Sequence, residues 1–279
     1  MKFKIKEITP EISELAGIFA ADGSMQKNHI CFWGNPASDK DLYDIHLTKL
    51  FLKAFNIKIN PHEKESNSVY GFYICKKNII KYFNQVLKFP IGKKTYSLNI
   101  PDIIYTSKDQ RIVCSFIKGF FAGDGCLNFD KRYANDQKIL KIIHTYPRLQ
   151  IKSVSKKIIY QLSELLKRLK IKNFIYKYHN KKKNEADSYL LQISGISRLE
   201  KWSQIIGFSN KNHSTRYEMF KKYGFVPSNT AYSDRLAILK GKLDPWSFYP
   251  KWARSLAWIR RQKNRKKSVL SLEPSKLRN

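Results

Sequence analysis

The sequence predicts an α+β protein built from two pseudo-symmetric α-β-β-α-β-β-α repeats, followed by a C-terminal helical extension. Three observations lead to this prediction. An apolar segment that ends in Asp-Gly occurs twice, the same order of helical and strand-like stretches follows each copy, and the last part of the chain matches neither copy. We assign residues 1–108 to the first repeat, 109–224 to the second repeat and 225–279 to a basic, aromatic extension.

The duplicated segment reads LAGIFAADG at residues 15–23 and IKGFFAGDG at residues 117–125. Gly17 matches Gly119, and each is followed four residues later by another small residue. Residues four apart share one face of a helix, and a stripe of small residues lets two helix backbones approach closely. A glycine inside a helix costs about 1 kcal/mol relative to alanine. Its recurrence at a matched position therefore predicts two helices in close contact.

Each copy ends in an aspartate, Asp22 or Asp124, that is followed by a glycine. The glycine, Gly23 or Gly125, suits a left-handed residue that ends a helix. The aspartate is unfavourable there, because it faces the negative end of the helix dipole at a cost of up to about 1 kcal/mol. A single Asp-Gly would be an ordinary turn. A local preference that is broken twice at matched positions indicates a functional site.

The stretches after the first motif alternate between strand-like and helical patterns. We expect strands at 29–33, 57–64 and 69–75, helices at 39–55 and 78–87, and a basic loop at 91–94. In the second half we expect a motif helix at 111–125, strands at 128–129, 138–144, 148–153, 174–179 and 189–194, and helices at 155–169 and 198–207. Residues 50–59 resemble 165–174, residues 209–211 repeat the basic loop, and short helices are expected at 236–239 and 252–259.

Both motif segments resemble the dodecapeptide helix of LAGLIDADG homing endonucleases, in the single-chain form that carries two motifs. The resemblance covers about residues 10–224. It implies that the two helices pack against each other at a pseudo-twofold axis and that the two sheets form a saddle over a DNA duplex. It also implies that Asp22 and Asp124 each deliver a carboxylate to the metal ions that cut the two DNA strands.

The charge of the chain agrees with a polyanionic partner. Lys and Arg number 53 against 22 Asp and Glu, which gives a formal net charge of +31, and such an excess favours nucleic-acid binding. We expect double-stranded DNA as the partner, with intron RNA as a second one, and a monomer. No stretch has the roughly 18 apolar residues of a membrane span, and the start lacks the apolar core of a signal peptide. We therefore expect an intracellular protein in the cytoplasm, nucleoid or an organelle matrix.

The cysteines give no sign of a zinc site. The four thiols have no paired C-x-x-C spacing. We expect them to be buried and free.

Hydrolysis of a phosphodiester generally requires a metal ion, so we expect a metal site between the two aspartates. A metal ion lowers the pKa of water and neutralises charge on the phosphate, and Mg²⁺ prefers oxygen ligands. We expect two or three Mg²⁺ ions shared between Asp22 and Asp124. The backbone carbonyls of Ala21 and Gly123 are expected as further ligands, because the last carbonyls of a helix have no intrahelical partner. The negative helix end that disfavours a carboxylate favours a cation.

Lysines in the two basic loops are the other catalytic candidates. A basic residue near the scissile phosphate stabilises developing negative charge or holds a water molecule. We expect Lys94 in this role for the first repeat, with its neighbour Lys93 contacting DNA, and Lys211 for the second repeat.

Base recognition is expected from alternating polar residues on the strands, since one face of each sheet turns away from the core. The triplet Arg148, Gln150 and Lys152 is the strongest candidate, because it lies opposite Leu149 and Ile151. The other candidates for DNA contact are Lys27, His29, Trp33, Tyr70, Tyr73, Lys138, Tyr176, Lys177, Tyr189 and Gln192.

The sequence therefore predicts a Mg²⁺-dependent homing endonuclease that makes a double-strand break in a long asymmetric DNA site. Two alternatives stay open at this point. One is an RNA maturase that assists intron splicing with the same saddle, and the other is a DNA-binding regulator that does not cut.

Overall fold

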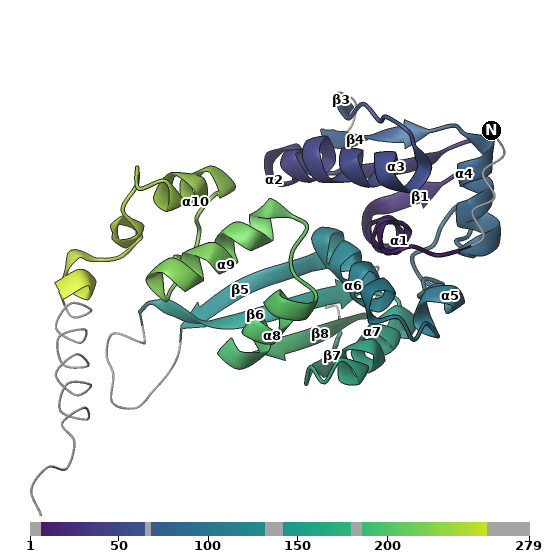
Figure 1. Ribbon diagram of the computed structural model, residues 1–279. Coiled ribbons are helices and arrows are strands. Elements are labelled where there is room, and N and C mark those ends of the chain that lie inside the picture. Colours follow the sequence, from purple (N-terminus) through teal and green to yellow (C-terminus); the bar gives the residue numbers. More distant parts are fainter. Residues whose placement is uncertain (1–6, 65–67, 132–141, 180–185, 256–279) are drawn as a thin grey trace, which may run out of the picture. The chain divides into compact units, whose positions relative to one another are not determined.

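The computed structural model shows an α+β architecture (Figure 1). The structure describes residues 7–64, 68–131, 142–179 and 186–255. Two compact units are present. The first comprises 1–128 and 147–217, and the second comprises 129–146 and 218–279.

The first half of the chain contains the predicted helices and strands in the predicted order. The helices are α1 (Pro10–Asp22), α2 (Pro36–Asp41), α3 (Thr48–Phe55), α4 (Lys77–Lys81) and α5 (Asp102–Tyr105), with π-helical turns η1 (Leu42–Leu47) and η3 (Tyr82–Val86). The strands are β1 (Gly23–Met25), β2 (Ile30–Gly34), β3 (His62–Lys64) and β4 (Val69–Ile74).

The second half repeats this arrangement and continues into further helices. Its helices are α6 (Gln110–Asp124), α7 (Lys156–Arg168), α8 (Ile196–Ile205), α9 (Lys211–Tyr223) and α10 (Tyr232–Leu239), with a 3₁₀ turn η5 (Pro245–Phe248). Its strands are β5 (Gly125–Lys131), β6 (His144–Ser153), β7 (Phe174–Tyr178) and β8 (Ser188–Ser194).

Two four-stranded antiparallel sheets have the same topology, β1-β2-β4-β3 and β5-β6-β8-β7. Their central strand pairs also have the same register. Cys31 is paired with Tyr73 in the first sheet, and Gln150 is paired with Gln192 in the second. Both partners of one pair are 119 positions from those of the other. The internal symmetry predicted from the duplicated motif is therefore confirmed at the level of individual strand positions.

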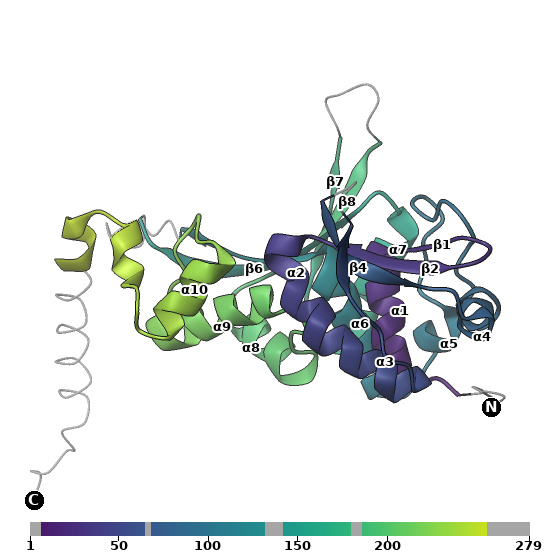
Figure 2. The same ribbon diagram turned by 90° about the horizontal axis from the view of Figure 1, so that it is seen from above.

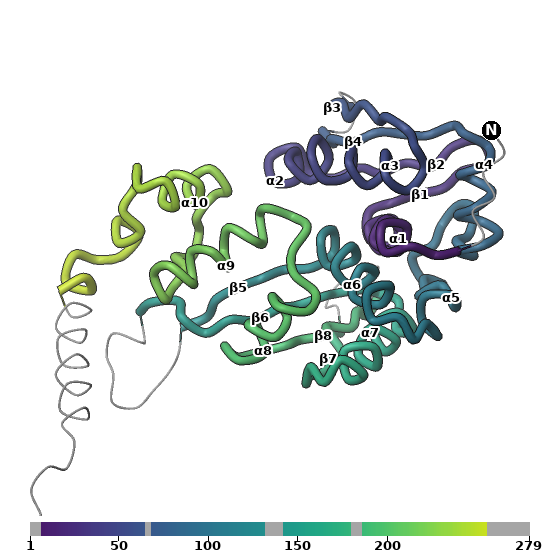
Figure 3. The backbone as a smooth tube through the Cα atoms, viewed as in Figure 1, coloured from purple at the N-terminus to yellow at the C-terminus, as the bar shows by residue number. Residues whose placement is uncertain are grey.

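The two motif helices, α1 and α6, lie side by side in the first unit (Figures 2 and 3). A β-carbon added at Gly17 would lie 2.2 Å from the carbonyl oxygen of Phe116, and one added at Gly119 would lie 2.1 Å from that of Glu14. Each glycine thus meets the backbone of the opposite helix with no room for a side chain. The close approach predicted from these two glycines is confirmed.

A buried carboxylate joins the two repeats beside this contact. Glu14 of α1 is 3 % exposed and receives hydrogen bonds from Lys118 Nζ at 2.7 Å and Ser209 Oγ at 2.5 Å, while His46 Nε2 lies 2.5 Å away. Burial by itself would raise the pKa of Glu14, but the hydrogen bonds and charges of His46 and Lys118 outweigh it and lower the pKa. The carboxylate is therefore a paired structural ion.

Aromatic rings fill the space between each sheet and its helices. Phe19 of α1 contacts Phe32, Phe83 and Phe89 at ring-centroid distances of 5.5, 5.0 and 4.8 Å. In the second repeat Phe121, which is equivalent to Phe19, contacts the Trp202 ring at 4.9 Å. Each motif helix therefore serves both as a contact to its partner helix and as the floor of its own repeat's core.

The glycines that follow the two aspartates are needed for a different reason than expected. Gly23 and Gly125 have φ of −77° and −88° and begin strands β1 and β5, so the prediction of left-handed residues is wrong. A β-carbon at Gly23 would lie 2.2 Å from the ring of Phe19, and one at Gly125 would lie 2.3 Å from the ring of Phe121. The small residue makes room for the aromatic ring four positions earlier.

The helix after the second strand is longer in the first repeat than in the second. It begins at Pro36, with Asn35 as its N-cap, and not at residue 39 as predicted. The left-handed residues that end the two helices, Asn56 and Lys170, are 114 positions apart, so the alignment of residues 50–59 with 165–174 is wrong by one position. Since the strand pairs are 119 positions apart, the first repeat has about five extra residues between the strand and the end of this helix.

Several other expectations need correction. The strand predicted over 57–64 is limited to β3, and the strands predicted at 138–144 and 148–153 are represented by β6, with residues 138–141 outside the described part. Helices α5 and α9 were not predicted. All four cysteines are free, as expected, but Cys75 is exposed and Cys126 half-exposed. Among the described residues no helix is long and apolar enough to cross a membrane.

The second unit has a small aromatic core of its own. Phe225 contacts Trp246 and Tyr249 at ring-centroid distances of 4.5 and 5.7 Å, and the Tyr249 hydroxyl lies 3.0 Å from His144 Nδ1. The aromatic stretch noted in the extension therefore packs as part of a folded unit. Of the helix expected at 252–259, residues 251–255 are helical and the remainder lies outside the described residues.

The close helix contact gives a prediction with an unusual sign. Intrinsic helix propensity alone would make Gly119→Ala more stable by about 1 kcal/mol. The structure predicts the opposite, because the new methyl group would overlap the Glu14 carbonyl oxygen, and overpacking of a rigid contact costs about 1–3 kcal/mol or more. We expect a net loss of about 2 kcal/mol in the free energy of unfolding, measured by urea denaturation.

Ala54→Gly, on the partly exposed side of α3, is the control, because it reports helix propensity without the helix–helix contact. A Gly119→Ala variant as stable as the wild type would show that α1 and α6 are not in backbone contact.

Candidate active site

The two motif aspartates lie together at the ends of α1 and α6. Asp22 and Asp124 are the last residues of these helices. A β-carbon added at Gly123 would lie 2.5 Å from Asp22 Oδ2 and 2.7 Å from the β-carbon of Ala21. The Asp22 carboxylate therefore rests against the backbone of α6 at the residue that precedes Asp124. Glycine at position 123 makes the space that this carboxylate occupies.

Both carboxyl groups hold protons more tightly than ordinary aspartates. Burial, together with the negative charges of Asp124 and Asp39, raises the pKa of Asp22 to about 7, and the charge of Lys94 opposes the rise. Burial among protein atoms also raises the pKa of Asp124 to about 6, again opposed by Lys94, although Asp124 as a whole residue is exposed to solvent. Two acids with raised pKa values in one place are typical of a functional site.

Lys94 caps the C-terminal end of α1. Its Nζ donates hydrogen bonds to the carbonyl oxygens of Phe19, of Ala20 at 2.7 Å and of Ala21 at 3.3 Å. Burial lowers the pKa of Lys94 to about 8, and the charges of Asp124 and Asp22 partly offset this. The basic loop thus brings one cation to the aspartate pair, as the sequence predicted for Lys94. The neighbouring Lys93 is exposed in the loop.

The equivalent place in the second repeat is held by a neutral residue. Asn210 is 2 % exposed, and its Nδ2 donates to Ala122 O at 3.1 Å and to Asp39 Oδ1 at 2.8 Å. Ala122 of α6 matches Ala20 of α1, so Asn210 corresponds to Lys94. Lys211, the residue predicted for this role, instead forms an ion pair with Asp41 at 3.2 Å.

The extra turn of helix in the first repeat adds two residues beside Asp22. Asp39 accepts hydrogen bonds from Asn210 and from the Asn35 amide at 2.9 Å. A β-carbon at Gly34 would lie 3.0 Å from both Asp39 Oδ2 and the Tyr43 hydroxyl. Tyr43 is fully buried, its hydroxyl has no hydrogen-bond partner in the described part of the chain, and burial with the charges of Asp22 and Asp39 raises its pKa.

No pattern in the sequence singles out these two positions. The second repeat has no matching pair of residues in its shorter helix, so the comparison of repeats does not identify Asp39 and Tyr43. Asn210 lies in the loop that the sequence identifies as equivalent to the loop of Lys94, and it is adjacent to Lys211. A catalytic role for a positive charge favours Lys211 of these two residues.

The site offers hard oxygen ligands of the type that Mg²⁺ accepts. Two carboxylates converge, and the Gly123 carbonyl is one of the unpaired groups at a helix end. The Ala21 carbonyl already accepts a hydrogen bond from Lys94, so its role as a ligand is weaker than expected. Among the described residues no group of three or more His, Cys, Asp or Glu side chains gathers around a metal-sized space. Water and phosphate oxygens would have to complete the coordination of an ion held here.

The second sheet presents a polar outer face. Asn128, Gln150, Gln192 and Ser194 form a chain of side-chain hydrogen bonds with lengths of 3.4, 2.9 and 3.0 Å. The register of β6 with β8 places Arg148 and Lys152 on this same face. The predicted triplet is therefore on one face together with Gln192.

Not every predicted DNA contact lies on an outer face. Lys177 is paired with Tyr189, on the side of the sheet opposite Gln192, and forms an ion pair with Asp187 at 3.1 Å. Tyr70 is 7 % exposed and donates to Asp44 at 2.5 Å, so it is a core residue. Lys138 lies outside the described residues. The remaining candidates Lys27, His29, Trp33, Tyr73 and Tyr176 lie on or beside exposed sheet surface.

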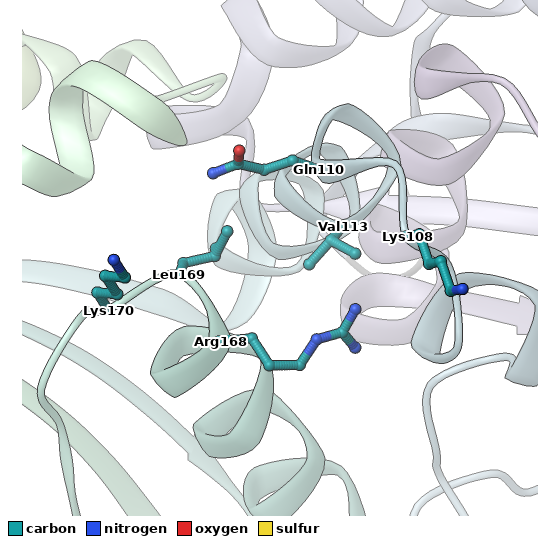
Figure 4. A pocket seen from close by; sticks show the side chains of 6 residues that line it. All are labelled: Lys108, Gln110, Val113, Arg168, Leu169 and Lys170. Atoms are coloured by element: carbon teal, nitrogen blue, oxygen red, sulfur yellow. The ribbon is translucent and has the colours of Figure 1, made fainter.

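A separate basic cavity lies far from the aspartate pair. It has a volume of about 340 Å³ and is lined by Lys108, Gln110, Val113, Arg168, Leu169 and Lys170 (Figure 4). Gln110 is the first residue of α6, and Asp124 is its last. At about 1.5 Å per residue, the helix separates this cavity from the site by roughly 20 Å.

Comparison with known proteins supports the resemblance seen in the motifs. Residues 111–207 match the family model of the LAGLIDADG-like domain. The chain is 26 % identical over 86 % of its length to an uncharacterized protein of Methanocaldococcus jannaschii, and 28 % identical over 68 % to a probable translation initiation factor of the same organism. It spans 25 % and 16 % of those proteins, so their names describe mostly other parts of their chains.

Solved structures share the fold. The LAGLIDADG homing endonuclease I-LtrWI bound to target DNA has a TM-score of 0.50 and 14 % identity, over 84 % of this chain and 98 % of that one. Mesophilic variants of the homing endonuclease I-DmoI give 0.47 and 19 %, over 71 % and 95 %. The N-terminal LAGLIDADG domain of WhiA gives 0.42 and 15 %, over 73 % and 85 %. The similarity to I-LtrWI shows that the α+β fold is that of LAGLIDADG homing endonucleases.

The raised pKa of Asp22 predicts that its ionisation destabilises the metal-free protein. The folded-state pKa of about 7 exceeds the model-compound value of 3.8, so folding is favoured below that lower value and loses stability as the pH rises toward 7. Asp22→Asn removes this cost. We expect the variant to be more stable at pH 8, by on the order of 2 kcal/mol after allowance for solvent screening, with the difference shrinking toward pH 4.

Urea denaturation in EDTA across this pH range measures the effect. Glu200→Gln, at an exposed carboxylate on α8, controls for the loss of a negative charge. An Asp22→Asn variant that is less stable than the wild type at pH 8 would contradict the account of the site.

Proposed function

We propose that this chain, which has the LAGLIDADG fold and a LAGLIDADG-like domain in its second repeat, is a site-specific homing endonuclease. It would cut both strands of a long asymmetric DNA target by metal-dependent hydrolysis. The observation that carries the proposal is the convergence of Asp22 and Asp124 at the touching ends of two helices. The neighbouring Lys94 ammonium supplies the positive charge that a phosphate requires.

The aspartates are suited to hold divalent cations and not to bind DNA directly. Two carboxylates beside a phosphate backbone repel it, and Lys94 offsets this repulsion only in part. A bound Mg²⁺ would supply a water molecule of lowered pKa and neutralise charge on the phosphate. Asp22 and Asp124 would lose their protons on binding it, so cation affinity should rise with pH through about 6 to 7.

Lys94 is placed to act on the reacting phosphate. It faces both aspartates and is held by carbonyl oxygens at the end of α1. An ammonium fixed beside the scissile group stabilises the negative charge that develops when water attacks phosphorus. A pKa near 8 also makes Lys94 a proton donor that works close to neutral pH. Asn210 offers only an amide at the equivalent place, so the two halves of the site differ in charge.

The sheets would position the duplex. Their outer faces carry alternating side chains of a size and polarity that a major groove admits. The formal charge of +31 accounts for sequence-independent attraction to the phosphates. The carboxylate pair favours cleavage over a regulator or a maturase, because a protein that only binds nucleic acid has no use for two repelling aspartates.

The decisive variant is Asp22→Asn combined with Asp124→Asn. We expect it to lose cleavage of a duplex-library target in Mg²⁺ by at least about 10³-fold, because the ligands for the catalytic ion are gone. Binding of the same duplex in EDTA should be unchanged or tighter, because two charges that repel phosphate are removed. Cleavage is read on denaturing gels, and binding is read by fluorescence anisotropy.

Retained cutting by this double variant would overturn the assignment of the site. Specific binding without any metal-dependent cutting by the wild type, across the whole library, would favour the regulator. Rescue of intron splicing without DNA cleavage would favour the maturase.

The role of Lys94 is tested with its neighbour as a matched control. Lys94→Met should lower the cleavage rate by about 10²-fold with little change in DNA affinity, since removal of one preorganised charge from a reaction centre has this effect. Lys93→Met removes an equal charge from the same loop at an exposed position, and it should weaken binding slightly without that loss of rate. Equal effects of the two substitutions would assign Lys94 to phosphate attraction only.

A further inference from the structure

The outer face of the first sheet is aromatic. Trp33 of β2, Tyr73 of β4 and His62 of β3 form a continuous group of rings. The His62 ring lies 5.6 Å from Trp33 and 6.2 Å from Tyr73 in edge-on geometry, and His29 lies 6.5 Å from Tyr73. Tyr73 is 57 % exposed. These four rings, three on strands and His29 just before β2, thus line a sheet surface that is turned away from the core.

This surface is hollowed. A cavity of about 390 Å³ is lined by these four rings and by the thiols of Cys31 and Cys75. Lys64 completes the lining, and its ammonium lies 5.7 Å from the centre of the Trp33 ring. The floor of the hollow is therefore apolar, and the charge that borders it is positive.

The second sheet has different chemistry at the same register. The pair Cys31 and Tyr73 of the first sheet corresponds to Gln150 and Gln192 of the second. Trp33 corresponds in the same way to Lys152. One sheet therefore presents rings and a thiol where the other presents amides and an ammonium. Two faces with such different groups cannot read a DNA target in the same way.

A DNA groove fits this hollow better than a protein surface does. The adjoining surface carries Lys58 and Lys76, which line a neighbouring hollow that shares His62, Tyr73 and Cys75. An apolar floor with lysines on its border matches a groove whose edges are phosphates and whose floor carries methyl groups. The C5-methyl of thymine is the one apolar group that the major groove displays, and side chains read it by apolar contact.

We propose, on the premise of the proposed function, that the first sheet recognises its half of the target through thymine methyl groups. Trp33 and Tyr73 are the specificity-determining residues, and the half-site they contact is rich in thymine. The second sheet reads its half-site through the hydrogen-bonding groups of Gln150 and Gln192. Glutamine pairs with adenine and lysine with guanine in the major groove, so that half-site is read by polar contacts.

Replacement of thymine by deoxyuridine tests this, because it deletes the methyl group and keeps every hydrogen bond. A duplex selected by binding in EDTA is prepared with deoxyuridine in one half, in the other half, or in both. We expect deoxyuridine to weaken binding when it replaces thymine in the half-site that the first sheet reads, by about four-fold for each methyl group that is buried. Substitution in the other half should change the affinity less than two-fold.

Two variants assign the effect to the first sheet. Tyr73→Ser should reduce the difference in affinity between the thymine and deoxyuridine duplexes, because one of the two apolar contacts is gone. Gln192→Ala, at the equivalent position of the second sheet, should keep the difference. Circular dichroism checks that both variants are folded. Tyr73→Phe, which keeps the ring, should retain the sensitivity to the methyl group and serves as a second probe.

Three results would overturn the proposal: equal affinity for all duplexes, equal loss from both halves, or a methyl effect that is undiminished in Tyr73→Ser. These results are distinct from a failure of the proposed function. Binding is measured without metal, so a protein that recognises methyl groups but never cuts would refute the nuclease and leave this inference standing. A protein that binds no duplex would refute both.

Discussion

The structure depends on the close approach of two helix backbones at Gly17 and Gly119. No side chain fits between α1 and α6 at these points, since each glycine lies against a carbonyl oxygen of the other helix. The contact fixes the two helix ends relative to each other and thereby brings Asp22 and Asp124 into one site. It also joins the floors of the two cores, because Phe19 and its counterpart in α6 pack on opposite sides of the same contact.

This arrangement has an electrostatic cost that Lys94 offsets only in part. Burial raises the pKa of both carboxyl groups, and their position at the negative ends of two helices also disfavours the ionised form. Lys94 relieves part of this cost on the side of α1. On the side of α6 the amide of Asn210 carries no charge, and Asp39 adds a further negative one. A site that is destabilised when empty is well suited to bind divalent cations strongly as the pH rises.

The fold and the pair of aspartates in the site were predictable from the sequence, because the two copies of a duplicated motif can be aligned with each other. Gly119 and Asp124 could be identified by comparison with the first copy. Features without a counterpart in the other repeat could not, as Asp39 and Tyr43 show. Asn210 and not the neighbouring Lys211 contacts the end of α6, because a one-residue difference in register decides which side chain reaches a helix end, and loop lengths do not fix that register. The catalytic role expected of Lys211 stays a prediction.

The anomalous diffraction of bound Mn²⁺ would show whether Asp22 and Asp124 share a cation site. Crystals of the wild-type protein with a duplex target and Mn²⁺ should give a peak within coordination distance of a carboxylate oxygen from each aspartate. The same crystals of the variant that lacks both carboxylates should give none there. A peak bound elsewhere, or two aspartates without a shared ion while DNA is seated on the sheets, would contradict the account.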